Sequence, residues 1–250
     1  MSKLSELVCG NVKKKEGDLG LSLQHLAETL SLLERHLHRA APRRRSLERL
    51  VCPFLIRGIM EVACTSLIGR RDPFRLLTLA KIQDQGTRLA SGRVAAAMQW
   101  SGDVLADGPV KNLWDSACKT EDMTRALLGD YQDQIFWQPA FERLLDYLAN
   151  DAGTMTFGQW TQRLRNTASE SLVPQLRQTA SRTYSQASKG VHHEFVLPMT
   201  TYYDDATLEE MTENALWLVA TMAVVANFDA STAFTLTPRR AIQCYEDLQP

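Results

Sequence analysis

The densest cluster of titratable side chains in this 250-residue sequence is His192-His193-Glu194. A histidine at this position could exchange a proton with a phosphate ester, and Lys189 or Arg182 could stabilise the negative charge that develops. These four basic residues give one hypothesis, a metal-independent helical ribonuclease. The other hypothesis treats the two histidines as the polar end of a helix, where the helix dipole favours positive charge.

The spacing of these residues favours the second, structural hypothesis. Helical ribonucleases of the HEPN type carry Arg-x(4–6)-His on one helix, which brings both side chains near one phosphate. Here Arg182 lies ten residues before His192, and we expect Gly190 to interrupt the helix between them. The ribonuclease therefore remains the alternative, and we expect no catalytic residue.

Motifs of other chemical sites are absent from the sequence. It contains no Gly-x-x-x-x-Gly-Lys-Ser/Thr, no Gly-x-Gly-x-x-Gly, no His-Glu-x-x-His and no Gly-x-Ser-x-Gly. The five cysteines are odd in number, and none has Cys-x-x-Cys spacing. We therefore expect no metal, no cofactor and no disulfide framework, and reduced thiols indicate a cytoplasmic protein.

Arginine is the residue type that gives the clearest functional indication. Arginines outnumber lysines 20 to 8, and the planar guanidinium suits phosphate and carboxylate recognition. Two groups of arginines surround expected interhelical turns. These arginines could neutralise several phosphates of a nucleic acid, whatever its base sequence. A docking surface for an acidic protein, or plain solvated loops, would use the same residues. The two groups are Arg39, Arg43, Arg44, Arg45 and Arg49, and Arg70, Arg71 and Arg75.

Charge divides the chain into two unlike parts. The first 100 residues carry 17 Lys/Arg against 9 Asp/Glu, and the remaining 150 carry 11 against 20. We therefore expect a non-catalytic subunit of a larger assembly, whose basic half contacts DNA, RNA or an acidic partner. Its acidic half would contact a protein partner. A compact helical chain without enzyme motifs is similar in character to accessory subunits of bacterial nucleic-acid-handling and phage-defence complexes.

A third hypothesis is a small-ligand sensor whose pocket lies between the two halves. The sequence offers only aromatic residues in its support, such as Trp100, Trp114 and Trp137. Large apolar side chains with a few polar groups are typical of ligand pockets, but they are equally typical of a core.

The elements that must position these residues are helices. Leu23, Leu26, Leu30, Leu33 and Leu37 recur at three- and four-residue steps, which is the period of an amphipathic helix. Asp72-Pro73, Thr237-Pro238 and the capping box Thr207-x-x-Glu210 predict helix starts. Without any alternating strand pattern, we predict an all-α, multi-helix globular fold, either single or built from two packed subdomains.

The predicted organisation has four parts. Residues 1–18 form a flexible polar tail, 19–100 a basic helical half, 101–110 a linker loop rich in glycine and proline, and 111–250 an acidic helical half. The longest apolar run, 216–228, is shorter than the roughly 20 residues of a bilayer span. We therefore expect no membrane contact.

Overall fold

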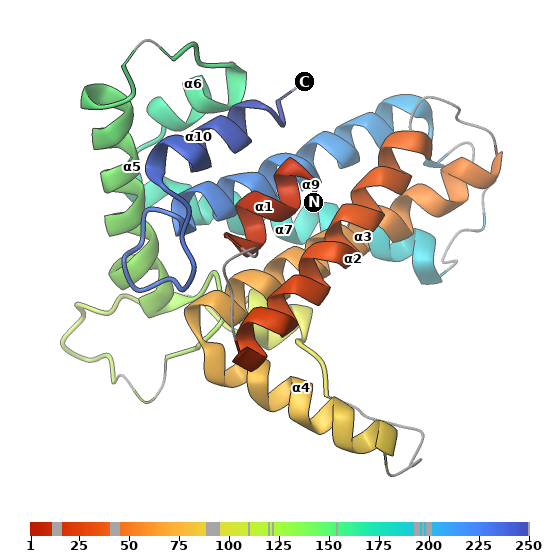
Figure 1. Ribbon diagram of the computed structural model, residues 1–250, viewed down its shortest axis with the longest axis horizontal. Helices are drawn as coiled ribbons and strands as arrows, with labels where there is room; N and C mark the ends of the chain where they lie inside the picture. Colours follow the sequence, from red (N-terminus) through yellow and green to blue (C-terminus); the bar gives the residue numbers. More distant parts are fainter. Residues whose placement is uncertain are drawn as a thin grey trace.

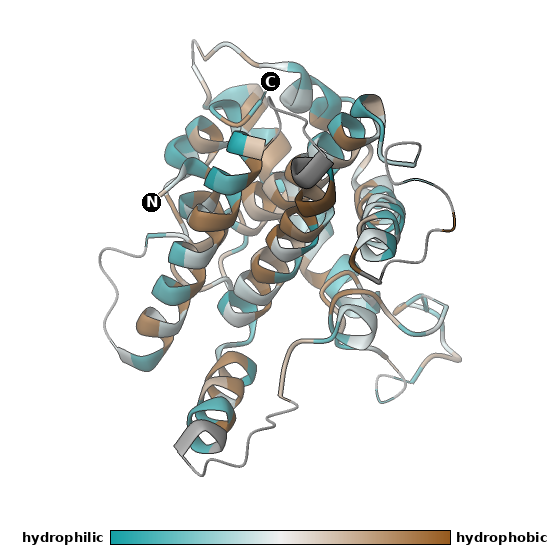
Figure 2. Cartoon of the chain, turned by 90° about the vertical axis from the view of Figure 1, so that its right-hand side faces the viewer, coloured by the Kyte–Doolittle hydropathy of each residue, from teal (hydrophilic) through white to brown (hydrophobic). Residues whose placement is uncertain are grey.

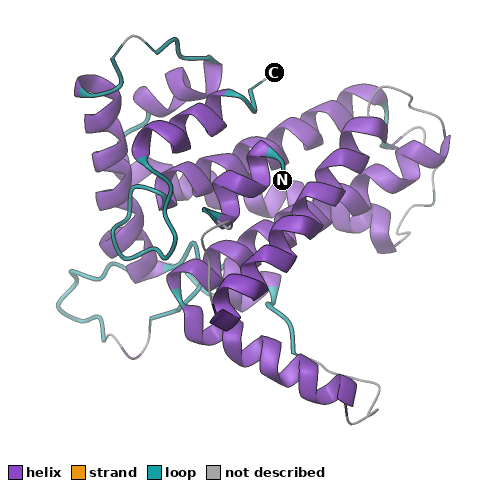
Figure 3. Cartoon of the chain, viewed as in Figure 1, coloured by secondary structure: helices purple, strands orange, loops and turns teal. Residues whose placement is uncertain are grey.

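A computed structural model gives the conformation of most of the chain. It describes residues 1–11, 17–40, 46–88, 96–109, 111–119, 121, 123–153, 155–192, 196, 198 and 202–249, and the side chains of all of these except 46–48, 86–88 and 192. The chain is 73% helical, and no strand occurs in these ranges (Figure 3). The predicted all-α, multi-helix fold is therefore confirmed.

In chain order the elements are α1 (Lys3–Cys9), α2 (Gly17–Ala40), α3 (Ser46–Arg71), α4 (Pro73–Arg88), the π-helical turns η2 (Trp100–Val104) and η4 (Gln132–Trp137), α5 (Gln138–Asn150), α6 (Gln159–Arg165), α7 (Ser169–His192), α9 (Asp205–Ala226) and α10 (Pro238–Glu246). Some helices follow one another directly, such as α3 and α4, whereas a long loop connects η2 to η4 (Figure 1).

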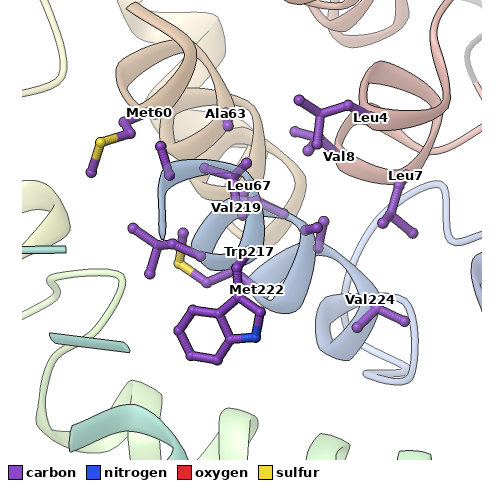
Figure 4. Close-up of a cluster of buried hydrophobic side chains, with 14 of the residues drawn as sticks. Leu4, Leu7, Val8, Met60, Ala63, Leu67, Trp217, Val219, Met222 and Val224 are labelled. Atoms are coloured by element: carbon purple, nitrogen blue, oxygen red, sulfur yellow. The ribbon is translucent and has the colours of Figure 1, made fainter. Parts of the chain in front are cut away.

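Helices α3 and α9 form the centre of the molecule. Helix α3 contacts α1, α2, α4, α7 and α9, and residues 217–226 of α9 are buried without interruption. Figure 4 shows Met60, Ala63 and Leu67 of α3 close to Val219 of α9. Helices from both charge halves thus share one hydrophobic cluster. Burial on all sides explains why α9 has no polar face in this stretch.

The first residues belong to the core and not to a tail. Leu4, Leu7 and Val8 of α1 are fully buried, and α1 packs against α2, α3, α9 and α10. Ser2 caps the helix by accepting a hydrogen bond from the Ser5 amide (3.2 Å). A seven-residue helix is not stable alone in water, so α1 exists because of this tertiary packing. Part of the predicted tail, residues 12–16, lies outside the described residues.

The first and last helices are joined by ion pairs. Arg240 of α10 donates to both carboxylate oxygens of Glu6 in α1, at 2.7 and 2.6 Å. Close by, the Lys3 ammonium lies 2.8 Å from the Asp247 carboxylate. The bidentate geometry fixes the angle between the two helices as well as their separation.

Residues 101–109 do not separate two independent cores. Val104 is 2% exposed, and the backbone here is bonded to a later segment. The Leu127 amide donates to the Asp103 carbonyl (2.8 Å) and the Leu128 amide to the Val104 carbonyl (3.0 Å). The change of charge sign at this loop therefore does not mark a break in packing.

Two of the three predicted helix starts are confirmed. The Arg75 amide bonds the Asp72 carboxylate (3.3 Å), and the Arg240 amide bonds the Thr237 hydroxyl (3.4 Å). The capping box at Thr207 is wrong, because α9 already begins at Asp205. Its cap is Asp204, whose carboxylate accepts from the Thr207 amide (2.8 Å).

Helix α3 is strongly apolar, although it does not contain the longest apolar run of the sequence. Residues Arg49–Arg71 are long and apolar enough to cross a membrane by length and composition, with a mean hydropathy of 1.6 (Figure 2). The core helix of a globular protein passes the same test, and 56% of this window is buried. Its place at the centre of the bundle accounts for its composition.

Candidate functional site

Arg49 and Arg70, one from each predicted arginine group, lie at opposite ends of α3. Arg49 stands in its first turn and Arg70 in its last. At 1.5 Å per residue the two are about 30 Å apart along the helix axis. They therefore do not form one continuous basic surface. Arg39, at the end of α2, is exposed, and Arg43, Arg44 and Arg45 lie outside the described residues.

Arg70 is fully buried and cannot reach a phosphate at the surface. Its guanidinium donates to the carbonyls of Val8 (2.8 Å) and Ala233 (2.9 Å) and to the Asn227 side chain (3.0 Å). Longer bonds reach the carbonyls of Leu7 and Phe234, both at 3.4 Å. Burial lowers the pKa of Arg70 to about 10. Its role is structural, because one side chain holds α1, α3 and the segment after α9 together.

Arg71 and Arg75 are also engaged within the fold. Arg71 bonds Gln132 (3.1 Å), lies 3.5 Å from the Asp229 carboxylate and packs over the Phe136 ring. Burial lowers its pKa to about 10. The Arg75 guanidinium is hydrogen-bonded to Asp103. Arg71 and Arg75 connect the junction of α3 and α4 to Asp103, Gln132 and Asp229. They are therefore not available as the nucleic-acid contacts that the sequence predicted.

The expected helix break at Gly190 is wrong, because α7 continues to His192. A Cβ on Gly190 would lie 2.8 Å from the Tyr203 hydroxyl and 2.9 Å from the Pro53 Cβ. The glycine therefore allows α3 and α7 to approach closely.

The structure does not bring Arg182 and Lys189 together at one site. Arg182 pairs with Glu210 of α9 (3.4 Å), and Lys189 bonds the Tyr202 hydroxyl (3.3 Å). His193 and Glu194, like the His192 side chain, lie outside the described residues.

A cavity of about 590 Å³ lies where helices of both halves meet. Its wall includes Cys52 of α3, Trp160 of α6 and the apolar side chains Leu208, Leu216 and Leu248. The polar lining comes from α1, α2, α3, α9 and the segment after α10. It consists of Lys3, Glu34, His38, Arg49, Glu209, Thr212, Glu213, Asp247 and Gln249.

Glu34 is the most unusual residue of this cavity. Its side chain is 8% exposed, and Oε1 lies 3.7 Å from Nε2 of His38, one turn further along α2. The other oxygen, Oε2, is screened from water and has no hydrogen-bond partner. A buried carboxylate is costly unless it is paired and fully hydrogen-bonded. The cavity wall therefore holds an incompletely compensated negative charge.

Two further polar atoms of the lining lack partners. Arg49 pairs with Asp205 through Nη2 (2.9 Å), but its Nε has no acceptor. Gln249 accepts from the Trp160 amide through Oε1 (2.8 Å), which fixes the amide orientation and leaves Nε2 without an acceptor. Buried polar groups are rarely left unpaired. One unpaired acceptor and two unpaired donors therefore line this cavity, and the acceptor is the only one of the three on an acidic side chain.

No protein-family model, curated protein or solved structure matches this chain. Its function must therefore be argued from its own side chains.

The tryptophans that the sensor hypothesis named lie elsewhere. Trp137 is fully buried and bonds the Leu127 carbonyl (2.6 Å), while Trp114 is 73% exposed. Trp100 lines a second cavity of about 500 Å³ and stacks on Tyr184, with ring centroids 4.0 Å apart. The Tyr184 hydroxyl and Arg57 both bond Glu61 there (2.7 and 2.9 Å). This second site is internally satisfied, unlike the first.

One feature of the sequence indicates that the Glu34 side chain is buried. It lies four residues after Leu30 and three before Leu37, inside the leucine stripe of α2. An acidic residue on the buried face of an amphipathic helix must meet a partner or a cavity. By contrast, Trp160 and Gln249 join the site only through tertiary packing.

The Glu34–His38 pair predicts a pH dependence of stability. The neighbouring Glu34 carboxylate, the acceptor for the His38 imidazole N–H, raises the pKa of His38 above its ordinary 6.5. The pair therefore stabilises the fold below about pH 6.5, and this contribution is lost as the pH rises through the raised pKa. We expect His38→Gln to lower the urea midpoint at pH 5.5 and to match the wild type at pH 9. His36→Gln, an exposed position on the same helix, serves as the control. An equal loss at both pH values would show that the pair does not act through the histidine charge.

Proposed function

We propose that this chain is a small-ligand-binding protein and that the cavity between α2, α3, α9 and the C-terminal segment is its site. The observation that carries the proposal is the buried Glu34 carboxylate with an unpartnered oxygen in the cavity wall. Ligand sites are concave and mostly apolar, with volumes of about 300–1,000 Å³ and a few convergent polar groups. A volume of about 590 Å³ lies within this range.

The location of the cavity supports a sensing role. Glu34 and Arg49 belong to the basic half of the chain, whereas Trp160 and Glu213 belong to the acidic half. A ligand bound there contacts both halves at once and stabilises the arrangement in which they meet. Binding can thereby shift the population toward the conformation in which these elements are in contact.

Filling the cavity tests the proposal. Thr212 lies on the cavity side of α9, so Thr212→Phe should occupy part of the space. The control is Asn214→Phe, two residues further along α9, which places it about 160° from Thr212 around the helix axis. A panel of small cations, neutral compounds and anions is screened by melting temperature and then by calorimetry. We expect the compounds that stabilise the wild type to stabilise Asn214→Phe but not Thr212→Phe. An unchanged response of Thr212→Phe would remove the cavity as the site.

The nucleic-acid hypothesis stays a prediction, confined to Arg39, Arg43, Arg44 and Arg45. If they contact phosphates, duplex binding should weaken steeply with salt, with a log–log slope of about −0.9 for each phosphate contacted. We expect charge reversal of Arg43, Arg44 and Arg45 to glutamate to flatten this slope for all sequences alike. The control is reversal of Arg182, which is exposed on α7. If binding is unaffected, these arginines do not contact nucleic acid.

A further inference from the structure

We infer that the ligand of this cavity is an organic cation, an ammonium or guanidinium group carried on an apolar body. The inference rests on the proposed function and names the chemical class of its ligand. Charge, burial and the nature of the cavity wall support it independently.

The charges of the described lining residues favour a cation. Four carboxylates face two permanent cations, Lys3 and Arg49. Both cations already pair with a carboxylate, because Lys3 lies 2.8 Å from Asp247 and Arg49 lies 2.9 Å from Asp205, although Arg49 Nε has no acceptor. An anionic ligand would therefore meet cations that already have a carboxylate partner, and it would lie close to the unpartnered carboxylate oxygen of Glu34.

Glu34 supplies the specific contact. The side chain is 92% buried, since only 8% of its surface is exposed, and Oε2 has no donor. His38 compensates it only in part, because the Oε1–Nε2 distance is 3.7 Å and the imidazole is 64% exposed. A ligand cation within about 4–6 Å would complete the compensation, because opposite charges at this distance favour the ionised form.

The remaining wall indicates what carries the charge. Leu208, Leu216 and Leu248 provide apolar surface, and Trp160 adds an aromatic ring. Such a wall contributes by removing apolar ligand surface from water. A small hydrated metal ion would leave these side chains without a role, whereas an amine on an aromatic or aliphatic body uses all of them.

Matched probes test the charge preference. Tryptamine, tryptophol and indole-3-acetate share one body and differ in charge, as do phenethylamine, 2-phenylethanol and phenylacetate. In calorimetry on the full chain, we expect each amine to bind at least about tenfold more tightly than its alcohol, which corresponds to about 1.4 kcal/mol. We expect the carboxylates to bind more weakly still.

Glu34→Gln removes the charge and preserves the shape of the side chain. We expect it to weaken amine binding at least about tenfold and to leave alcohol binding unchanged. At pH 9, where the pair with His38 no longer stabilises the fold, we also expect it to raise the melting temperature of the free protein, because it removes a poorly compensated buried charge. Glu28→Gln, an exposed position on α2, should change none of these.

The possible failures differ in meaning. Alcohols that bind as tightly as amines, or a Glu34→Gln variant that weakens both alike, would overturn the cation while leaving a ligand site at the cavity. If no probe binds and Glu34→Gln melts no higher than the wild type at pH 9, the cation is likewise overturned. The broader panel with Thr212→Phe then decides the proposed function separately.

Discussion

Replacing Arg70 with methionine is expected to lower the free energy of unfolding by about 3–5 kcal/mol, because it leaves several buried carbonyl groups without a hydrogen-bond donor. The methionine fills a similar volume but donates no hydrogen bond. It leaves the Val8 and Ala233 carbonyls without the donor that they now share, whereas the Asn227 side-chain oxygen keeps its hydrogen bond from the Leu236 amide (2.8 Å). Each buried acceptor left unpaired costs about 1–3 kcal/mol.

Urea unfolding measures this effect, with Arg39→Met as the matched control. Arg39 is exposed at the end of α2, so its replacement should change stability by no more than about 0.5 kcal/mol. Arg70→Lys should fall between the two, since it keeps a charge but loses the planar fork. Equal stability of the Arg70→Met and Arg39→Met proteins would contradict the structural role assigned to Arg70.

Gly10→Ala is expected to destabilise the protein by about 2–5 kcal/mol, as the sum of backbone strain and overpacking. Gly10 follows α1 with φ 72° and ψ −159°, a conformation open almost only to glycine. A Cβ there would lie 2.0 Å from the Phe234 carbonyl oxygen and 3.3 Å from the guanidinium carbon of Arg70. The same carbonyl accepts from Arg70, so the clash disturbs the network around that residue.

Gly17→Ala separates the two contributions. Gly17 also has a positive φ of 82°, but nothing lies within 4 Å of its added Cβ. It should therefore show the strain alone, about 1 kcal/mol. Thermal unfolding of both variants gives the comparison. If Gly10→Ala costs no more than Gly17→Ala, the close approach of residue 234 is not a constraint.

The long helices could be predicted from the sequence because their packing leaves a periodic pattern. The leucine stripe of α2 marks one buried face, and Asp72-Pro73 and Thr237-Pro238 mark helix starts. Helix α1 could not be predicted in this way. Its seven residues are too few for a periodic signal, and what stabilises it lies far away in α9 and α10.

Most of the candidate site could not be predicted from the sequence, because its residues come together only through contacts between distant segments. An arginine beside another arginine looks basic and exposed in sequence, yet the partners of Arg70 lie 62 to 164 residues away. From residue type alone, a buried arginine that joins several segments cannot be distinguished from an exposed arginine that contacts phosphate. Glu34 is the exception, because its position inside an apolar stripe is visible locally. The change from net positive to net negative charge after residue 100 reflects composition, and it does not coincide with a boundary in the packing.

The ion pair between Glu6 and Arg240 has a consequence for how the protein is made. The two residues are 234 positions apart, so α1 leaves the ribosome long before its partner helix has been synthesised. At about 5–20 residues per second, this interval lasts on the order of ten seconds or more. During that time Leu4, Leu7 and Val8 lack part of their final packing, and a short helix cannot hold its shape alone. The nascent chain therefore exposes part of the apolar face of α1 until α10 has been synthesised.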